Sequence, residues 1–171
     1  MKIVTPLLSA IGLSTVLLSS AYASETSTKF TVAIIKGAAG SNEIKDGNYH
    51  IGLESLSAAS TTSSFDKNMG LCVAHLQAKS FTNAEVACTE AITVIDTNKA
   101  KGPRAKLLKA LAYSNRGIVK YFQDDEYGAL ADLSSALLLA DDPVIVNNIN
   151  YLKSTESKKS YADNDIIIAS E

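Results

Sequence analysis

The 171-residue sequence predicts an all-α fold of about six helices, and two observations carry the prediction. Apolar residues recur three or four positions apart almost continuously over 43–153, which places them along one face of a helix. Short polar clusters, several with Gly or Pro, divide this stretch into segments of helical length. The expected helices span about 48–59, 65–79, 82–95, 103–122, 125–139 and 143–154.

Residues 1–23 have the order of a cleavable export signal. Lys2 precedes an apolar stretch, and the small residues Ala21 and Ala23 then flank a tyrosine. This order predicts cleavage after Ala23. Ser, Thr and Gly interrupt the apolar run, which is therefore shorter than the roughly 20 apolar residues of a membrane span. We expect a periplasmic or secreted protein without stable membrane insertion after cleavage; an uncleaved anchor is the alternative.

Two segments flank the predicted helical domain at 43–153. Residues 24–42 are rich in Ser, Thr, Gly and Ala and contain one β-favouring apolar run, 30–35, so we expect an extended N-terminal arm. Residues 154–171 are polar and charged except around the three isoleucines at 166–168. A disordered tail is expected there, and an edge strand or a sticky contact made by the isoleucines is the alternative.

Charge and composition argue against several classes of partner. The chain has 16 Lys and Arg against 18 Asp and Glu, and the loss of Lys2 with the signal makes it slightly more acidic. A chain without a basic run lacks the electrostatic drive for nucleic-acid binding. Two cysteines and the distant His50 and His75 do not provide a zinc ligand set. We therefore expect no nucleic-acid partner, no metal and no cofactor.

Cys72 and Cys88 are expected to form a disulfide, since export takes the chain to an oxidising compartment. The two cysteines are equally far from a turn near residue 80, so an antiparallel helix hairpin would place them level with each other. Small residues such as Gly70 and Ala84 would then help the Cα atoms approach within the roughly 4.4–6.8 Å that a disulfide requires.

One spacing of residues occurs three times, with a small first residue, a middle residue at +4 and a small residue at +7. The three sets are Gly52, Leu56, Ala59; Ala84, Cys88, Ala91; and Ala129, Leu133, Ala136. One helix face holds all three positions of a set. The small residues would let a neighbouring helix approach closely, while the middle residue fills the gap between two helices.

The helices before the last two sets carry a glycine at a matching place, Gly70 or Gly117, and with it the pattern resembles tetratricopeptide repeats. The best match consists of Tyr113, Gly117, Tyr121, Ala129, Leu133 and Ala136. The unit from Gly70 to Ala91 matches with two extra residues, and 47–59 resembles half of a further repeat. The resemblance covers about 110 residues and implies a short right-handed solenoid of α-hairpins, capped by 143–153. An irregular helical bundle is the alternative.

The resemblance implies a protein–protein interaction module, a scaffold or adaptor with no catalytic chemistry of its own. In the family, the first helices of the repeats line a concave surface that receives a peptide or protein segment. Carried over by position, this surface contains Lys67, Leu71, Ala74, Ser114, Ile118 and Tyr121. Leu71 and Ile118 depart from the asparagine and basic residues of the subfamily that clamps a terminal carboxylate, which puts such a ligand in doubt.

Two other functional classes stay open at this point. A small extracytoplasmic enzyme could use a reactive Cys72, with His75 three residues further along the same helix. A free thiol of low pKa would favour this enzyme, and an oxidised cysteine would disfavour it. The third class is a structural envelope protein that associates with itself. Arg116 lies in an Asn-Arg-Gly run that is frequent in the repeat family, so a structural role is expected for it.

Overall fold

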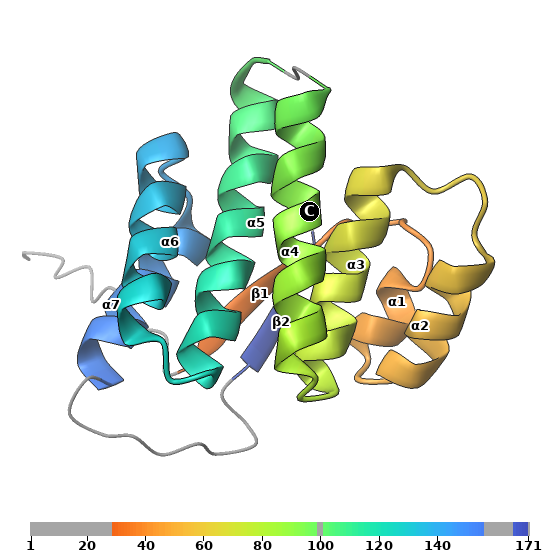
Figure 1. Cartoon of the computed structure of the whole chain (residues 1–171), viewed down its shortest axis with the longest axis horizontal. Coiled ribbons are helices and arrows are strands. Elements are labelled where there is room, and N and C mark those ends of the chain that lie inside the picture. Colours follow the sequence, from red (N-terminus) through yellow and green to blue (C-terminus); the bar gives the residue numbers. More distant parts are fainter. Residues whose placement is uncertain (1–28, 99–100, 156–165, 171) are drawn as a thin grey trace, which may run out of the picture.

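The computed structural model describes residues 29–98, 101–155 and 166–170 (Figure 1). In these residues the chain is mostly helical, as predicted. The elements are β1 (Phe30–Ile34), α1 (Ser41–Lys45), α2 (Tyr49–Ala58), α3 (Ser64–Gln77), α4 (Phe81–Thr97), α5 (Pro103–Phe122), α6 (Glu126–Leu139), α7 (Pro143–Thr155) and β2 (Ile166–Ser170). The predicted signal peptide at 1–23 lies outside the described residues.

Local signals explain where α3, α5, α6 and α7 begin. The Ser63 hydroxyl accepts a hydrogen bond from the first turn of α3, and the Asp125 carboxylate does the same for α6. Both side chains thereby satisfy a backbone N–H that has no partner within the helix. Pro103 and Pro143 are the first residues of α5 and α7, where a missing N–H costs little.

Successive helices pack side by side, with the most extensive contacts in the pairs α3–α4 and α5–α6 (Figure 1). The glycines of the predicted pattern lie where helices approach closely, Gly117 between α5 and α6 and Gly70 between α3 and α2. A Cβ atom added to Gly117 would lie 3.0 Å from Cγ of Leu133 and 3.1 Å from the carbonyl oxygen of Ala129. A Cβ atom on Gly70 would lie 2.9 Å from a methyl carbon of Leu56 on α2. The small residues therefore permit the close approach that the sequence pattern predicted.

The N-terminal run forms a strand, β1, that is part of the hydrophobic core. It packs against α3, α5 and α7 and crosses behind the helix layer in Figure 1. Four of its five residues are buried, and only Thr31 is partly exposed. Its alternate side chains enter two different clusters, so β1 links the two halves of the core. The expected extended arm is thus extended over 30–34, but it is an interior element.

Residues 166–170 form a strand as well. β2 pairs with β1 in parallel, in a register that runs from Phe30 opposite Ile166 to Ile34 opposite Ser170. The prediction of a disordered tail is wrong for these residues, and the edge-strand alternative is correct. β-branched isoleucines favour extended backbone, and β1 offers an edge with unpaired backbone groups that a strand can satisfy. Residues 156–165 and 171 lie outside the described residues.

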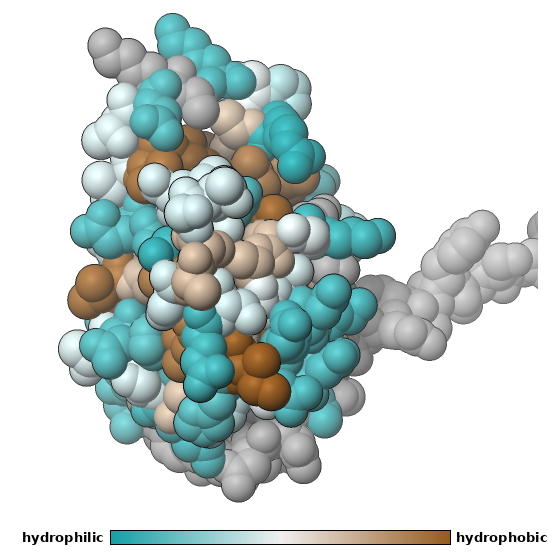
Figure 2. Space-filling view, turned by 90° about the vertical axis from the view of Figure 1, so that its right-hand side faces the viewer, coloured by the Kyte–Doolittle hydropathy of each residue, from teal (hydrophilic) through white to brown (hydrophobic). Residues whose placement is uncertain are grey.

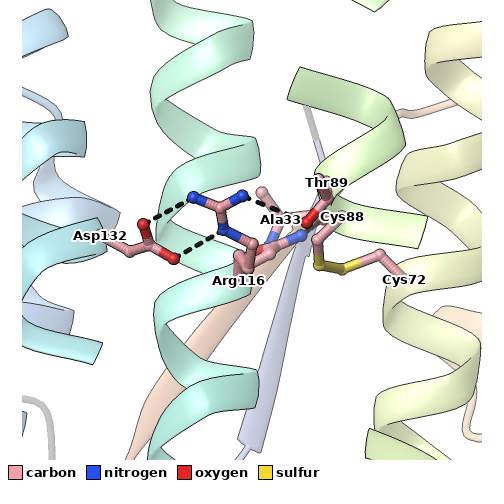
Figure 3. Close-up of a disulfide and its surroundings, with 7 residues drawn as sticks. Ala33, Cys72, Cys88, Thr89, Arg116 and Asp132 are labelled. Carbon is pink, nitrogen blue, oxygen red and sulfur yellow. Dashed lines mark hydrogen bonds and ion pairs between the residues drawn. A yellow bond between two sulfur atoms is a disulfide. The ribbon is translucent and has the colours of Figure 1, made fainter. Parts of the chain in front are cut away.

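The predicted disulfide is present and joins α3 to α4 (Figure 3). The Cα atoms of Cys72 and Cys88 are 5.0 Å apart, within the range that a disulfide requires. Such a bond is compatible with an oxidising compartment outside the cytoplasm. In the described parts of the chain, none of the helices has the length and apolarity needed to cross a membrane.

Candidate functional site

Two buried asparagines hold β1 by its backbone. On α5, the Asn115 side chain accepts a hydrogen bond from the Ala33 N–H (2.9 Å) and donates one to the Ala33 carbonyl (2.8 Å). On α7, Asn148 makes the same pair of bonds with Thr31, at 2.8 and 2.7 Å. Both asparagines are fully buried. The contacts involve only the main chain of β1, so they recognise extended backbone whatever its side chains are.

The geometry explains why asparagine occupies these two positions. A carboxamide has one carbonyl acceptor and two N–H donors, so a single side chain can pair with both the N–H and the C=O of one strand residue. Asn115 and Asn148 thereby supply the bonds that a neighbouring strand would make along this edge of β1. We call the edge that faces the helices, with the backbone groups of Thr31 and Ala33, the inner edge of β1.

Further contacts fix the position of the strand between the helices. The second N–H of the Asn148 carboxamide donates to the Ser114 hydroxyl at 2.9 Å, which fixes the amide orientation and links α5 to α7. The Phe30 ring is fully buried and lies edge-on to Tyr121 and Tyr151, with ring centroids 4.9 and 4.6 Å apart. The N-terminal end of β1 is therefore held by aromatic packing as well as by hydrogen bonds.

The opposite edge of β1 is the one that pairs with β2. Backbone N–H groups of successive strand residues point to opposite edges. Since Thr31 and Ala33 face the helices, the backbone groups of Phe30, Val32 and Ile34 face away from them, toward β2. We call this the outer edge of β1. It is the place where the fold accepts an extended segment from a distant part of the chain.

The structure divides the six predicted binding residues into a buried group and a partly exposed pair. Ala74, Ser114, Ile118 and Tyr121 are buried, while Lys67 and Leu71 are partly exposed. Ser114 belongs to the asparagine network, and Ile118 and Tyr121 share the core cluster of Phe30. The chain's own strand thus packs with part of the surface that the resemblance assigned to a partner.

Arg116 has a structural environment, between α4 and α6 (Figure 3). Its guanidinium donates to both carboxylate oxygens of Asp132, at 2.7 and 2.8 Å, and to the Thr89 hydroxyl at 3.1 Å. The hydrogen bond to Asp132 raises the pKa of the Arg116 guanidinium. Lys120 approaches the same carboxylate at 3.1 Å. These contacts tie three helices together.

The enzyme alternative depends on the state of Cys72. Cys72 is bonded to Cys88, so its sulfur is not a thiol nucleophile in this state. Burial lowers the pKa of the neighbouring His75 imidazole. Within the described ranges there is no group of three or more His, Cys, Asp or Glu residues that could hold a metal ion. The strongest arrangement of polar groups around an interior position is the one that holds β1.

The end of the molecule formed by α1 and α2 differs from the β1 region. In the view that faces this end, apolar residues are visible as separate spots divided by hydrophilic ones (Figure 2). Ile51 on α2 is about half exposed, at 53%. Scattered apolar residues are usual on protein surfaces, so this face adds no second candidate site.

Comparison with known proteins adds no family: no family model, no curated protein and no solved structure matches the chain.

Neither asparagine was among the binding residues predicted from sequence. Asn115 was noted only as part of the Asn-Arg-Gly run, and Asn148 was not singled out. The available signal was the amide's position: Asn148 lies among Ile145, Ile149 and Leu152 on the apolar face of its helix. A buried polar side chain needs a hydrogen-bond partner, so an asparagine at a core position points to an unpaired backbone segment nearby.

Proposed function

We propose that this is an exported protein–protein interaction module with no catalytic chemistry of its own, and that its binding element is the outer edge of β1. The observation that carries the proposal is the two-sided use of β1. Its inner edge is bonded to Asn115 and Asn148, and its outer edge receives a five-residue segment from the far end of the chain. A strand held in this way is a template for β-strand addition.

A tetratricopeptide-like arrangement is part of the proposal. Its support is the packing of consecutive helix pairs and the close contacts at Gly70 and Gly117. In such an arrangement α3, α5 and α7 are the first helices of successive units. They are also the helices that contact β1, which agrees with a shared inner surface. The binding surface of this chain would then consist of β1 together with those helices.

Energetics favour the outer edge over displacement of β1. Burying a Phe, Val or Ile side chain contributes about 1.5–3 kcal/mol, and β1 with Ile35 buries four of them. Their sum of roughly 6–12 kcal/mol is comparable to the whole stability of a typical domain, about 5–15 kcal/mol. A partner that expelled β1 would therefore have to unfold the protein. Replacing β2 leaves the asparagine bonds and the helix core intact.

Export rests on two supports. The first 23 residues have the order of a signal peptide, and the disulfide suits an oxidising compartment. Periplasmic or secreted location follows, and intact-mass measurement of the exported protein tests it. A chain that begins at Ser24 agrees with the proposal, whereas a retained Met1 contradicts it.

Peptide binding to an opened edge tests the function. In the full-length chain, proline at both Ile167 and Ile168 removes the β2 pairing, because consecutive N–H groups face opposite edges and one of the two must belong to the ladder. A fluorescent peptide with the sequence of residues 164–171 should bind this double variant, as measured by anisotropy. The matched control is the same peptide with the two prolines, which should not bind. Equal binding of both peptides, or binding of neither by a variant with normal helicity, contradicts the proposal.

A further inference from the structure

We infer that the strand accepted by the outer edge of β1 can come from a second copy of this chain, so that two molecules exchange their β2 strands. This inference rests on the proposed function, since it requires the outer edge to be an acceptor for an extended segment. It adds the identity of the partner, the orientation of the incoming strand and its register.

The observed pairing already defines the contact between the two copies. β2 is parallel to β1 in a five-residue register, and the β2 strand of another copy has the same sequence and the same direction. It would therefore make the same backbone bonds without any new recognition element. The helices and the inner-edge bonds of Asn115 and Asn148 do not depend on which copy supplies β2.

The place of β2 in the chain makes the exchange possible. α7 ends at Thr155, and β2 begins at Ile166. The ten residues between α7 and β2 can span up to about 35 Å when extended. With a connection of this reach, β2 can leave β1 and pair with a neighbour while the described helices stay in place.

Reciprocal exchange produces a closed dimer. Each copy donates one β2 and accepts one, which satisfies both outer edges by two-fold symmetry and leaves no acceptor for a third molecule. A short tether holds a strand at an effective concentration on the order of millimolar near its own acceptor. Intrachain pairing therefore predominates in dilute solution, and the exchanged dimer increases with protein concentration.

Disulfide trapping across the register tests this inference. Thr31 lies opposite Ile167, and the native cysteines are already bonded to each other, so an added cysteine is the only thiol in each variant. Thr31→Cys and Ile167→Cys chains, one of them isotope-labelled, are mixed at increasing concentration, oxidised and analysed by mass spectrometry. We expect a mixed dimer joined by a 31–167 disulfide. Its yield should rise with protein concentration and should be more than ten times the yield of the control. The control is Thr31→Cys mixed with Ile51→Cys, which reports random collision at an exposed site.

Two outcomes overturn the inference. In the first, the yield of the mixed 31–167 dimer is no higher than that of the control at any concentration, although a single chain that carries both cysteines does form the 31–167 bond within itself. If a cysteine variant fails to fold, light scattering decides instead. A concentration-dependent dimer of the unmodified chain that the double proline variant lacks supports exchange, and a monomer in both overturns it. Peptide binding to the opened edge together with absent exchange leaves the proposed function standing and removes only the second copy as partner.

Discussion

Replacing Asn115 with alanine should destabilise the protein far more than a typical substitution. The change removes both hydrogen bonds to Ala33 and leaves a buried backbone N–H and a buried C=O without partners. An unsatisfied buried group costs about 1–3 kcal/mol, so for two such groups we expect a loss of roughly 2–6 kcal/mol in the free energy of unfolding. Asn148→Ala should cost a similar amount: its bonds to Thr31 are only partly buried, but Ser114 loses a buried partner as well.

Urea unfolding followed by circular dichroism measures these losses from the shift in midpoint at constant slope. Asn150→Ala is the matched control, since Asn150 is an exposed asparagine on α7, and its cost should stay within about 0.5 kcal/mol. Asn115→Asp separates the two bonds: the carboxylate can still accept from the Ala33 N–H, but it faces the Ala33 carbonyl with a second acceptor. A cost for Asn115→Ala no larger than that of Asn150→Ala would refute the reasoning about backbone satisfaction.

The other predictions concern the disulfide, the Arg116 contacts and His75. Reducing the Cys72–Cys88 bond, which closes a separation of 16 residues, should cost about 3 kcal/mol and lower the melting temperature by roughly 10 °C; an unchanged melting curve contradicts this. Arg116→Ala should lower the free energy of unfolding by about 3–5 kcal/mol, because it leaves the buried Asp132 carboxylate with Lys120 alone. In a double-mutant cycle, Arg116→Ala combined with Asp132→Ala should cost less than the sum of the two single changes. Burial lowers the pKa of the His75 imidazole, so the unfolded chain binds a proton at His75 more tightly than the folded chain does. The free energy of unfolding should therefore fall as the pH drops below 6.5, the ordinary pKa of histidine. Urea titrations at pH 7 and pH 5 should show a smaller fall for His75→Gln than for the unmodified chain.

The helical part of the fold was predictable because its signals are local. Periodicity, the small-residue sets and the prolines at 103 and 143 predicted α2 to α7 within a few residues, whereas the short helix α1 at Ser41–Lys45 was not predicted. The disulfide was predictable as well, since an antiparallel hairpin with a turn near residue 80 places Cys72 level with Cys88. Both inferences need only the geometry of one helix or one hairpin.

The strands were harder to predict because their partners are remote in sequence. The 30–35 run had the composition of a strand, but nothing local indicated that helices would bury it. β2 pairs with a segment more than 130 positions away, so its isoleucines alone could not distinguish a strand from a disordered tail. Asn148 illustrates the same limit: its role depends on Thr31, which lies 117 positions earlier.

The central claim is that the two edges of β1 are held independently, the inner edge by asparagine side chains and the outer edge by a replaceable strand. Amide hydrogen exchange measured by NMR on the full-length chain, with and without proline at both Ile167 and Ile168, tests it most directly. The N–H groups of Thr31 and Ala33 should stay protected in the variant, while those of Val32 and Ile34 should exchange at least tenfold faster. Adding the peptide of residues 164–171 should restore their protection. Simultaneous loss of protection at all four amides, or at none of them, would contradict the claim.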